Sequence, residues 1–313
     1  MRQRSGPPRW SRRALLRGLG AVVATAGVPR RVLAAATSLV TKAVPTTGER
    51  VPVVGMGSWI TFDVPPLEVF LAPRVEVVRA LFAGGGGVVD SSPMYGRAED
   101  VIGRCLRRLG KQPALLAATK VWTPLQWMGR GQLDDSRQLW GLERFWLLQI
   151  HNMLAWEDHL ETLRRQKVEG RTRYIGITTS HGRRHEEMEQ VLSRERFDFV
   201  QLTYNIFDRE VERRLLPLAM DRGVAVIANR PFRRGELIER FAGKPLPPWA
   251  REIGCTSWPQ FLLKFIVSHP AVTCAIPATS RPEHMAENLG AARGAMPDAA
   301  MRQRMIRWAE GLS

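Results

Sequence analysis

Hydrophobic residues fall into short runs, separated by longer stretches in which apolar residues recur every three or four positions. Short apolar runs are typical of buried parallel strands, and the three-and-four spacing is typical of amphipathic helices. The runs predict strands over residues 53–57, 88–90, 115–119, 146–150, 174–178, 199–202, 224–228 and 273–276. The stretches between and after them predict helices over residues 73–83, 98–108, 133–142, 157–167, 184–192, 210–222, 258–267 and 282–292.

This alternation predicts an α/β fold. Eight strand–helix units in about 250 residues favour a single (β/α)8 TIM barrel over a doubly wound sheet. The turn residues 46–49 (Thr-Thr-Gly-Glu) lie between short strand-like segments, which predicts a hairpin ahead of the barrel. No G-x-G-x-x-G motif joins a strand to a helix. Residues 84–87, a run of four glycines, precede a strand, so they indicate a helix stop rather than a phosphate-binding loop.

The first 36 residues differ from the rest of the chain in charge. They contain no acidic residue, and their basic residues are Arg2, Arg4, Arg9, Arg12, Arg13, Arg17, Arg30 and Arg31. Arg12-Arg13 followed by Leu15-Leu16 resembles a twin-arginine export signal, and the apolar run 18–28 and the small residues 34–36 complete the pattern. The apolar run is too short to span a bilayer, which needs about 20 residues.

From this resemblance we expect residues 1–36 to be a twin-arginine signal peptide, cleaved near Ala36. Residues 37–50 would then form the lead-in and hairpin, and residues 51–313 the barrel. The signal implies the twin-arginine export machinery as a partner and a periplasmic or otherwise extracytoplasmic location. No stable membrane insertion is expected after cleavage. The alternative is a basic N-terminal tail without a targeting role.

Composition excludes several classes of protein. A chain with 44% hydrophobic and 24% charged residues is neither disordered nor collagenous nor a membrane bundle. Without the eight N-terminal arginines, 38 basic residues face 30 acidic ones. Because no basic block interleaved with aromatics occurs in this part, we expect a solvated arginine-rich surface and no nucleic-acid partner. Cys105, Cys255 and Cys274 form no C-x-x-C motif, so we expect three thiols in or near the core.

Four chemically complementary residues lie at or just after the ends of three successive predicted strands: Asp90, Tyr95, Lys120 and His151. Catalytic groups of barrels lie at the carboxyl ends of the strands, so we expect these four to meet. An ammonium near the phenol favours the phenolate and lowers its pKa, and a carboxylate holds the ammonium in place. A tyrosine tuned in this way can give a proton to an alkoxide, while the imidazole polarises the carbonyl oxygen. The set predicts carbonyl reduction and the reverse oxidation.

At these residues the sequence resembles the aldo/keto reductase family, over roughly residues 42–292. The motif D-x-x-x-x-Y-G-x-x-E spans residues 90–99 and is highly specific. Further matching segments are residues 51–59, 119–122, 148–152, 173–178 and 276–288. The resemblance implies Tyr95 as general acid and base, Lys120 and Asp90 as its tuning pair, and His151 as the orienting residue. It also implies a small-molecule carbonyl substrate and NADP(H), with NAD(H) as the alternative, bound across the barrel mouth.

The resemblance also implies cofactor-binding positions, at several of which this sequence departs from the family. A Thr178-Thr179 pair replaces the family's Ser-Asn pair, Asn229 replaces a stacking aromatic, and Ala278 replaces a lysine. At the position of the family's arginine stands His284, and we expect Arg281 to supply the guanidinium for a 2′-phosphate. The expected cofactor-binding residues are Thr178, Thr179, Gln201, Arg230, Thr279, Ser280, Arg281, His284, Glu287 and Asn288.

Trp59 and Trp122 adjoin the catalytic segments, so we expect them to line a substrate pocket. His181 and His185 stand four residues apart, a spacing that can bind zinc, but arginines lie between them and we expect a surface pair rather than a metal site. Two alternatives to the reductase remain. One is a barrel that binds the cofactor or senses redox state with little turnover, and the other is a metal-dependent hydrolase, for which the strand ends lack a ligand set.

Overall fold

A computed structural model of the chain describes residues 39–312. The predicted signal peptide, residues 1–36, lies outside the described residues, and so does its cleavage site. Among residues 39–312, no helix is both long and apolar enough to cross a membrane.

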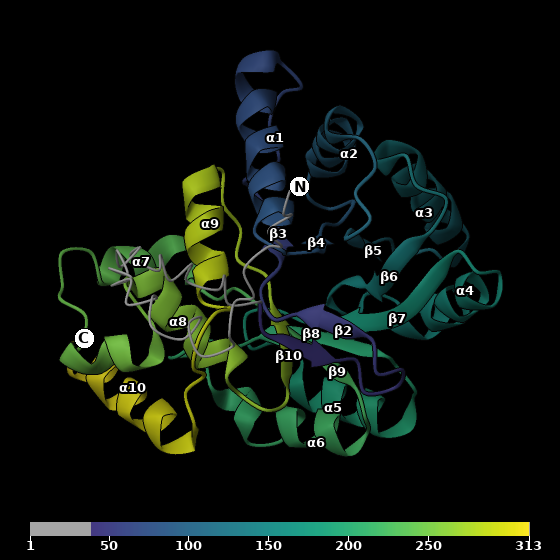
Figure 1. Cartoon of the computed structure of the whole chain (residues 1–313). Coiled ribbons are helices and arrows are strands. Elements are labelled where there is room, and N and C mark those ends of the chain that lie inside the picture. The colour runs from purple at the N-terminus through teal and green to yellow at the C-terminus, as the bar shows by residue number, and fades with distance from the viewer. Residues whose placement is uncertain (1–38, 313) are drawn as a thin grey trace, which may run out of the picture. The chain divides into compact units, whose positions relative to one another are not determined.

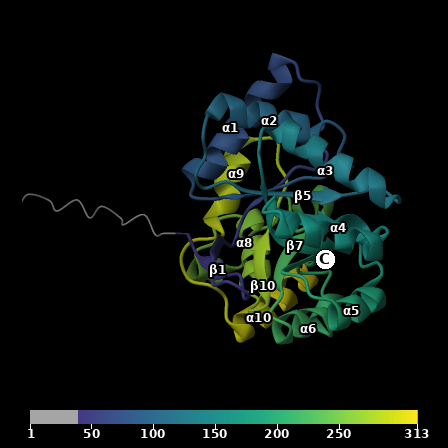
Figure 2. The same cartoon turned by 90° about the vertical axis from the view of Figure 1, so that its right-hand side faces the viewer.

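Eight parallel strands form the barrel in the order β10-β9-β8-β7-β6-β5-β4-β3. Backbone hydrogen bonds from Gly55 N to Ala275 O (2.9 Å) and from Gly57 N to Pro277 O (3.0 Å) join the first barrel strand to the last. The predicted (β/α)8 barrel is therefore confirmed (Figure 1, Figure 2). The strands are β3 (Met56–Gly57), β4 (Val88–Asp90), β5 (Leu116–Val121), β6 (Phe145–Ile150), β7 (Thr172–Thr178), β8 (Phe199–Thr203), β9 (Ala225–Asn229) and β10 (Val272–Ala275).

The helices on the outside are α1 (Glu68–Ala83), α2 (Ala98–Leu109), α3 (Gln126–Trp140), α4 (Trp156–Val168), α5 (His185–Arg194), α6 (Leu215–Asp221), α7 (Glu236–Arg240), α8 (Trp258–Val267), α9 (Pro282–Gly290) and α10 (Ala299–Gly311). The helix predicted over 210–222 is broken. A short 3-10 turn at Glu210–Glu212 precedes α6, which begins anew at Leu215. This start places Pro217 in the first turn of α6, where the N–H that proline lacks is not needed.

Two further differences from the prediction concern helix α3 and helix α10. Helix α3 begins at Gln126, seven residues before the predicted start at 133, because its first turns are exposed and carry few apolar residues to form a pattern. Helix α10 was not predicted at all. It begins after Asp298, whose carboxylate accepts a hydrogen bond from Met301 N at 2.8 Å and caps the helix.

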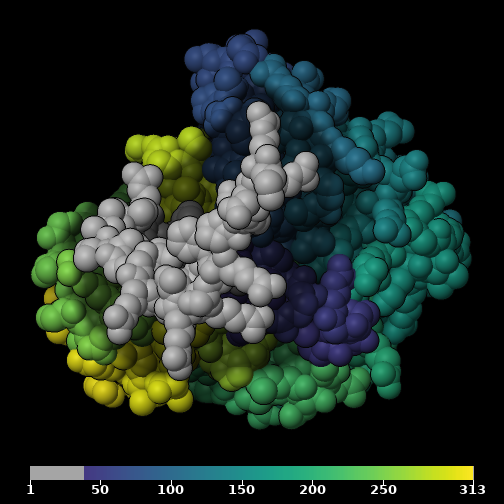
Figure 3. All heavy atoms as spheres, viewed as in Figure 1, coloured from purple at the N-terminus to yellow at the C-terminus, as the bar shows by residue number. Residues whose placement is uncertain are grey.

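A hairpin of β1 (Thr41–Ala43) and β2 (Arg50–Pro52) covers the amino-terminal end of the barrel. Lys42 Nζ donates to the carbonyl oxygens of His269 and Val272, each at 2.6 Å, just before and at the start of β10. The hairpin lies at the surface on the side shown in Figure 3, where it is purple. Because this end is closed, access to the barrel interior must be from the carboxyl ends of the strands.

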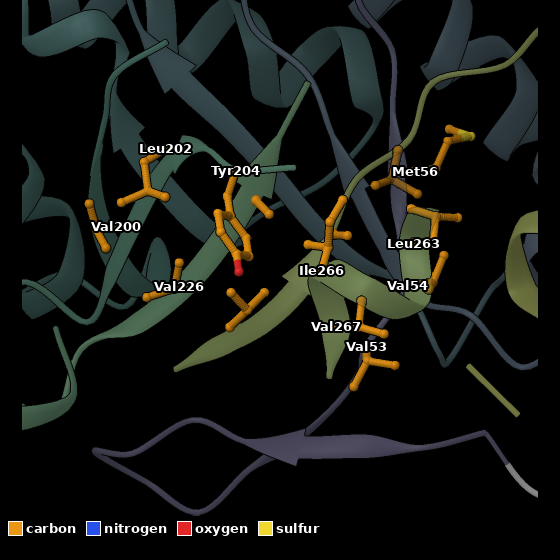
Figure 4. Packing of buried hydrophobic residues seen from close by; sticks show 14 of the residues in the cluster. Val53, Val54, Met56, Val200, Leu202, Tyr204, Val226, Leu263, Ile266 and Val267 are labelled. Carbon is orange, nitrogen blue, oxygen red and sulfur yellow. The ribbon is translucent and has the colours of Figure 1, made fainter. Parts of the chain in front are cut away.

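The main hydrophobic core fills the layer between the barrel and its helices. Figure 4 shows Val200, Leu202 and Val226 from β8 and β9, and Ile266 from α8, within this cluster. The three cysteines are buried free thiols, as expected. Burial raises the pKa of Cys105 and of Cys255 to about 12, so the thiols are protonated at neutral pH.

Candidate active site

A cavity of about 600 Å³ opens at the carboxyl ends of the barrel strands. Asp90, Tyr95 and His151 line it, and Lys120 lies directly behind them. The chain brings these side chains together because Asp90 ends β4, Lys120 is the penultimate residue of β5 and His151 follows β6. The structure thus places all four predicted catalytic residues in one cluster.

Asp90 and Lys120 form a buried ion pair. Lys120 Nζ lies 2.6 Å from Asp90 Oδ2 and donates a second hydrogen bond to Ser91 O at 2.7 Å. Their side chains are 2% and 0% exposed. Burial alone would lower the pKa of Lys120, but Asp90 and Tyr95 together raise it above its usual value. The ammonium therefore keeps its charge in a dry site, where its field is strong.

The Tyr95 ring lies against this ion pair, with Lys120 Nζ 5.1 Å from the ring centroid. Burial raises the pKa of Tyr95, and Asp90 raises it further. Lys120 lowers the same pKa, as the sequence predicted, but its effect does not outweigh burial. The phenol is consequently protonated at neutral pH, which is the form that a proton donor requires.

His151 lies on the other side of Tyr95, with ring centroids 5.6 Å apart and the rings nearly perpendicular. Its Nδ1 is 2.8 Å from Ser92 Oγ, within hydrogen-bonding distance. Burial, with a smaller effect of Lys120, lowers the pKa of His151 to about 2. The ring is therefore neutral, and it can form a hydrogen bond to a carbonyl oxygen without adding charge to the site.

Sequence reasoning missed Gln149. This residue is fully buried, and its Nε2 donates to Asp90 Oδ1 at 3.0 Å. The sequence pattern could have indicated this residue, because Gln149 is the one amide in the otherwise apolar strand Phe145–Ile150. Gln201, predicted to bind the cofactor, lines the cavity but also donates from Nε2 to Asp90 Oδ1 at 3.0 Å.

Most of the predicted cofactor-binding residues line the same cavity: Thr178, Gln201, Arg230, Thr279, His284, Glu287 and Asn288. Thr179, Ser280 and Arg281 are outside this lining. Thr179 Oγ1 donates to Arg183 O at 2.5 Å. Arg281 is largely exposed, and its guanidinium pairs with Glu283 at 2.5 Å. The structure therefore does not bring Arg281 together with the rest of the set.

Two side chains at positions where this sequence departs from the family already have partners in the fold. Thr178 Oγ1 accepts a hydrogen bond from Asn152 N at 2.9 Å. Asn229, which stands where the family has an aromatic, accepts from Thr203 Oγ1 at 2.7 Å and donates to Thr179 O at 2.9 Å. Asn229 thus links the ends of three neighbouring strands.

The segment after β9 brings arginines to the cavity in an unusual backbone conformation. Arg230, Arg233 and Arg234 all have positive φ, at 51°, 48° and 64°. Left-handed non-glycine residues cost about 1–3 kcal/mol each and are found mainly where a ligand or a network of contacts holds them. Here the Arg234 guanidinium lies 4.5 Å from the centroid of the Trp59 ring. Sequence reasoning included Arg230 in the site but missed Arg234.

Of the two tryptophans predicted to line a substrate pocket, one lies in the cavity and the other does not. Trp59 lines the cavity, and its ring centroid lies 6.3 Å from that of Tyr95. Trp122 is outside the lining and 41% exposed.

His181 lies 2.7 Å from a guanidinium nitrogen of Arg230, and His185 lies 3.5 Å from Glu210. Within residues 39–312, no group of three or more histidine, cysteine or acidic side chains is placed to hold a metal.

Comparison with known proteins adds a family assignment to this geometry. The family model described as "Aldo/keto reductase family" matches residues 54–304. The chain is 24% identical to aldo-keto reductase YhdN of Bacillus subtilis (strain 168) over 208 residues, which is 61% of this chain and 61% of that protein. It is 25% identical to the NADH-specific methylglyoxal reductase of Escherichia coli (strain K12) over 230 residues, 63% of this chain and 69% of that protein. The match thus spans about three fifths of the Bacillus protein's length.

Solved structures show the same fold. An aldo/keto reductase from Klebsiella pneumoniae, in complex with NADP and acetate, has a TM-score of 0.71 at 22% identity, covering 84% of this chain and 93% of that one. The holo form of aldo-keto reductase AKR11C1 from Bacillus halodurans has the same TM-score at 21% identity, covering 87% and 96%.

Proposed function

Because the chain belongs to the aldo/keto reductase family, we propose that it reduces an aldehyde or ketone to an alcohol with a nicotinamide cofactor. The observation that carries this proposal is the cluster of Tyr95, the Asp90–Lys120 ion pair and neutral His151 at the mouth of the barrel. A protonated phenol beside a buried ammonium is suited to giving a proton to a developing alkoxide.

The proposed reaction assigns one task to each residue. A reduced nicotinamide, when bound, supplies a hydride to the carbonyl carbon. Tyr95 gives its phenol proton to the carbonyl oxygen and becomes a phenolate. The Lys120 ammonium, held by Asp90, stabilises that phenolate, and His151 orients the carbonyl oxygen by a hydrogen bond. The reverse oxidation uses the same groups in the opposite order.

The donor set of the cavity fits NADP(H), with NAD(H) as the alternative. Three guanidinium groups, of Arg183, Arg230 and Arg234, line the cavity and match the negative charge of phosphates. Thr279 and Asn288 in the same lining supply further polar groups. The relatives support both cofactors, since the Klebsiella structure contains NADP and the Escherichia enzyme is NADH-specific.

A direct test is the oxidation of NADPH, and separately of NADH, by residues 37–313 over a panel of aldehydes and ketones. We expect turnover with at least one carbonyl class and none without carbonyl. The second candidate, a barrel that binds the cofactor or senses redox state, is favoured by Asn229 and Thr179, whose side chains are engaged within the protein. Stoichiometric NADPH binding without turnover on any carbonyl would support that candidate instead.

We also propose that the protein is exported by the twin-arginine route and acts outside the cytoplasm, with residues 1–36 removed. The support is the Arg12-Arg13 motif in an acid-free segment. Changing both residues to lysine keeps the charge but removes the guanidinium groups, so a receptor specific for arginine should no longer bind. We expect the precursor of this double variant to stay in the cytoplasm. Normal export of the variant would contradict the proposal.

A further inference from the structure

Two buried side-chain amides donate hydrogen bonds to the carboxylate of Asp90, which also holds Lys120. Asp90 Oδ1 accepts from Gln149 Nε2 and from Gln201 Nε2, each at 3.0 Å, and Asp90 Oδ2 accepts from Lys120 Nζ at 2.6 Å. The two oxygens of one carboxylate are thus divided between neutral donors and an ammonium. All of these side chains are at most 2% exposed, so water does not substitute for any of the donors.

We propose that Gln149 is a positioning residue for proton transfer by Tyr95. Its amide, together with that of Gln201, fixes the Asp90 carboxylate so that the other oxygen holds Lys120 beside the phenol. The inference rests on the proposed carbonyl reduction, in which Lys120 stabilises the phenolate of Tyr95.

The strand register places Gln149 for this task. Lys120 on β5 is paired with Gln149 on β6, which is paired in turn with Gly176 on β7. Paired residues of neighbouring strands point to the same face, so Gln149 projects into the barrel beside Lys120. Its side chain also approaches β8, where Gln201 Nε2 lies 3.4 Å from Gln149 Oε1.

Gly176 leaves the space that the Gln149 side chain occupies. A Cβ atom at Gly176 would lie 3.2 Å from Gln149 Cγ and 3.0 Å from Phe199 O, both closer than ordinary contacts. A side chain at this position would therefore press on Gln149 and on the backbone of β8. The fold thus combines a long amide on one strand with a glycine on the next.

The physical reason for the proposal is the environment of Asp90. A carboxylate oxygen without a donor is costly in a dry interior. If the Gln149 amide were absent, Asp90 Oδ1 would keep only the Gln201 amide as a donor, and the carboxylate would gain by turning until both oxygens share the Lys120 ammonium. That rotation would draw the ammonium toward Asp90 and away from the phenol. The rate of proton transfer from Tyr95 would fall, whereas the shape of the cofactor cavity would be unchanged.

The test compares Gln149→Met with Gln166→Met, because both replace a buried glutamine by an unbranched apolar side chain of similar length. Gln166 accepts a hydrogen bond from Arg137 at 2.9 Å and has no contact with Asp90. General acid catalysis is worth about 10²–10⁴-fold, and we expect Gln149→Met to lose about tenfold in kcat. The dissociation constant for NADPH, measured by quenching of tryptophan fluorescence, should stay within about twofold. Gln166→Met should change neither.

A second readout does not depend on turnover. The chain has three tyrosines, so ¹³Cζ-labelled tyrosine gives few signals, and Tyr95→Phe assigns that of Tyr95. We expect the Tyr95 signal to move in Gln149→Met and to stay in place in Gln166→Met. If the wild type reduced no carbonyl, the proposed function would fail, while this comparison would still decide whether Gln149 acts on the surroundings of Tyr95.

The positioning role is overturned if Gln149→Met keeps more than about half of the wild-type kcat, or if its Tyr95 signal moves no more than in the Gln166 variant. Gln149→Asn, whose shorter amide does not span the distance to Asp90, serves as the second variant and should behave like Gln149→Met. If neither variant folds, Gln149 is a structural residue and the proposal is wrong.

Discussion

The two halves of the barrel mouth hold their polar side chains in different ways. At the ends of β4, β5 and β6, Asp90, Lys120 and His151 are almost fully buried, and each has close partners within the cluster. At the ends of β7 to β10, arginines on partly exposed loops stand beside the buried threonine and amide side chains, and Arg230 and Arg234 have left-handed backbone conformations. One half is thus prepared before any ligand binds, whereas the other presents charge that a bound anion would organise.

The difference shows that electrostatic interactions are strong in the buried half and weak, group by group, in the exposed half. Buried ionised groups act strongly because the local dielectric is low, and removing one partner leaves a costly charge behind. Exposed guanidinium groups are screened by water and contribute modestly one by one. We therefore expect changes in the first half to alter chemistry and stability, and changes in the second to alter cofactor affinity.

The largest effect is expected for Tyr95→Phe, which removes the transferable proton and little else. Carbonyl reduction should fall by at least about 100-fold, because general acid catalysis contributes about 10²–10⁴-fold. Affinity for NADPH, measured by fluorescence quenching, should stay within about twofold. Tyr174→Phe is the matched control, since Tyr174 bonds to Thr47 and Glu49 at the closed end of the barrel. Retention of more than about half of the activity by Tyr95→Phe would refute the assignment.

Lys120→Met should reduce both activity and stability. It leaves Asp90 as a buried charge without its ammonium, a loss of about 3–5 kcal/mol in unfolding free energy. It also raises the pKa of Tyr95, because Lys120 lowers that pKa in the wild type. The double variant Asp90→Asn/Lys120→Met should regain stability but not turnover. Urea unfolding and kcat measure the two effects, and a single variant as stable as the wild type would contradict the buried-pair argument.

Acid should weaken the fold through His151. Its pKa is lowered from 6.5 to about 2 in the folded state, so the unfolded chain binds the proton more readily as pH falls. The histidine therefore costs no stability above pH 6.5, and between pH 6.5 and pH 5 its contribution to unfolding free energy falls by about 2 kcal/mol. His151→Gln should flatten this part of the stability–pH curve. His269, whose pKa is lowered to about 4, loses a comparable amount over the same pH range, so the variant keeps part of the wild-type slope.

Arg230→Ala and Arg234→Ala should weaken cofactor binding about tenfold each, since a charge-assisted hydrogen bond contributes about 1.5–3 kcal/mol. Turnover at saturating cofactor should change little. Arg214→Ala provides the control, because this largely exposed arginine pairs with Glu189 outside the cavity. Titration of NADPH measures the affinities. Loss of kcat with unchanged affinity would erase the contrast between the two halves.

The smallest effect is expected at Arg281. An exposed ion pair contributes about 0–1 kcal/mol, so Arg281→Ala should reduce the preference for NADPH over NADH by only about two- to threefold. Glu283→Gln should increase the preference, because it frees the guanidinium from its pairing at 2.5 Å. Steady-state constants with both cofactors decide the matter. A wild type that prefers NADH, or an unchanged ratio in Arg281→Ala, would rule out a role in phosphate recognition.

The same division explains what could be predicted from the sequence. Buried strands leave apolar runs, so the barrel and the strand-end residues Asp90, Lys120 and His151 follow from the pattern. The helix predicted for α3 starts too late, because the exposed first turns of α3 have no such pattern. The sign of the Tyr95 pKa shift could not be predicted, since it depends on how burial balances Lys120. The loop with Arg234 has no periodicity, and its contact with Trp59 depends on a backbone conformation that sequence alone does not indicate.

The buried thiols have a practical consequence for chemical labelling. Only a thiolate reacts readily with maleimides or disulfides, and all three cysteines are buried, with Cys105 and Cys255 at pKa values of about 12. The native protein should therefore be inert to such reagents. A cysteine introduced at Val168, which is 88% exposed, would be the single reactive position, so a spectroscopic probe can be attached without first removing any natural cysteine.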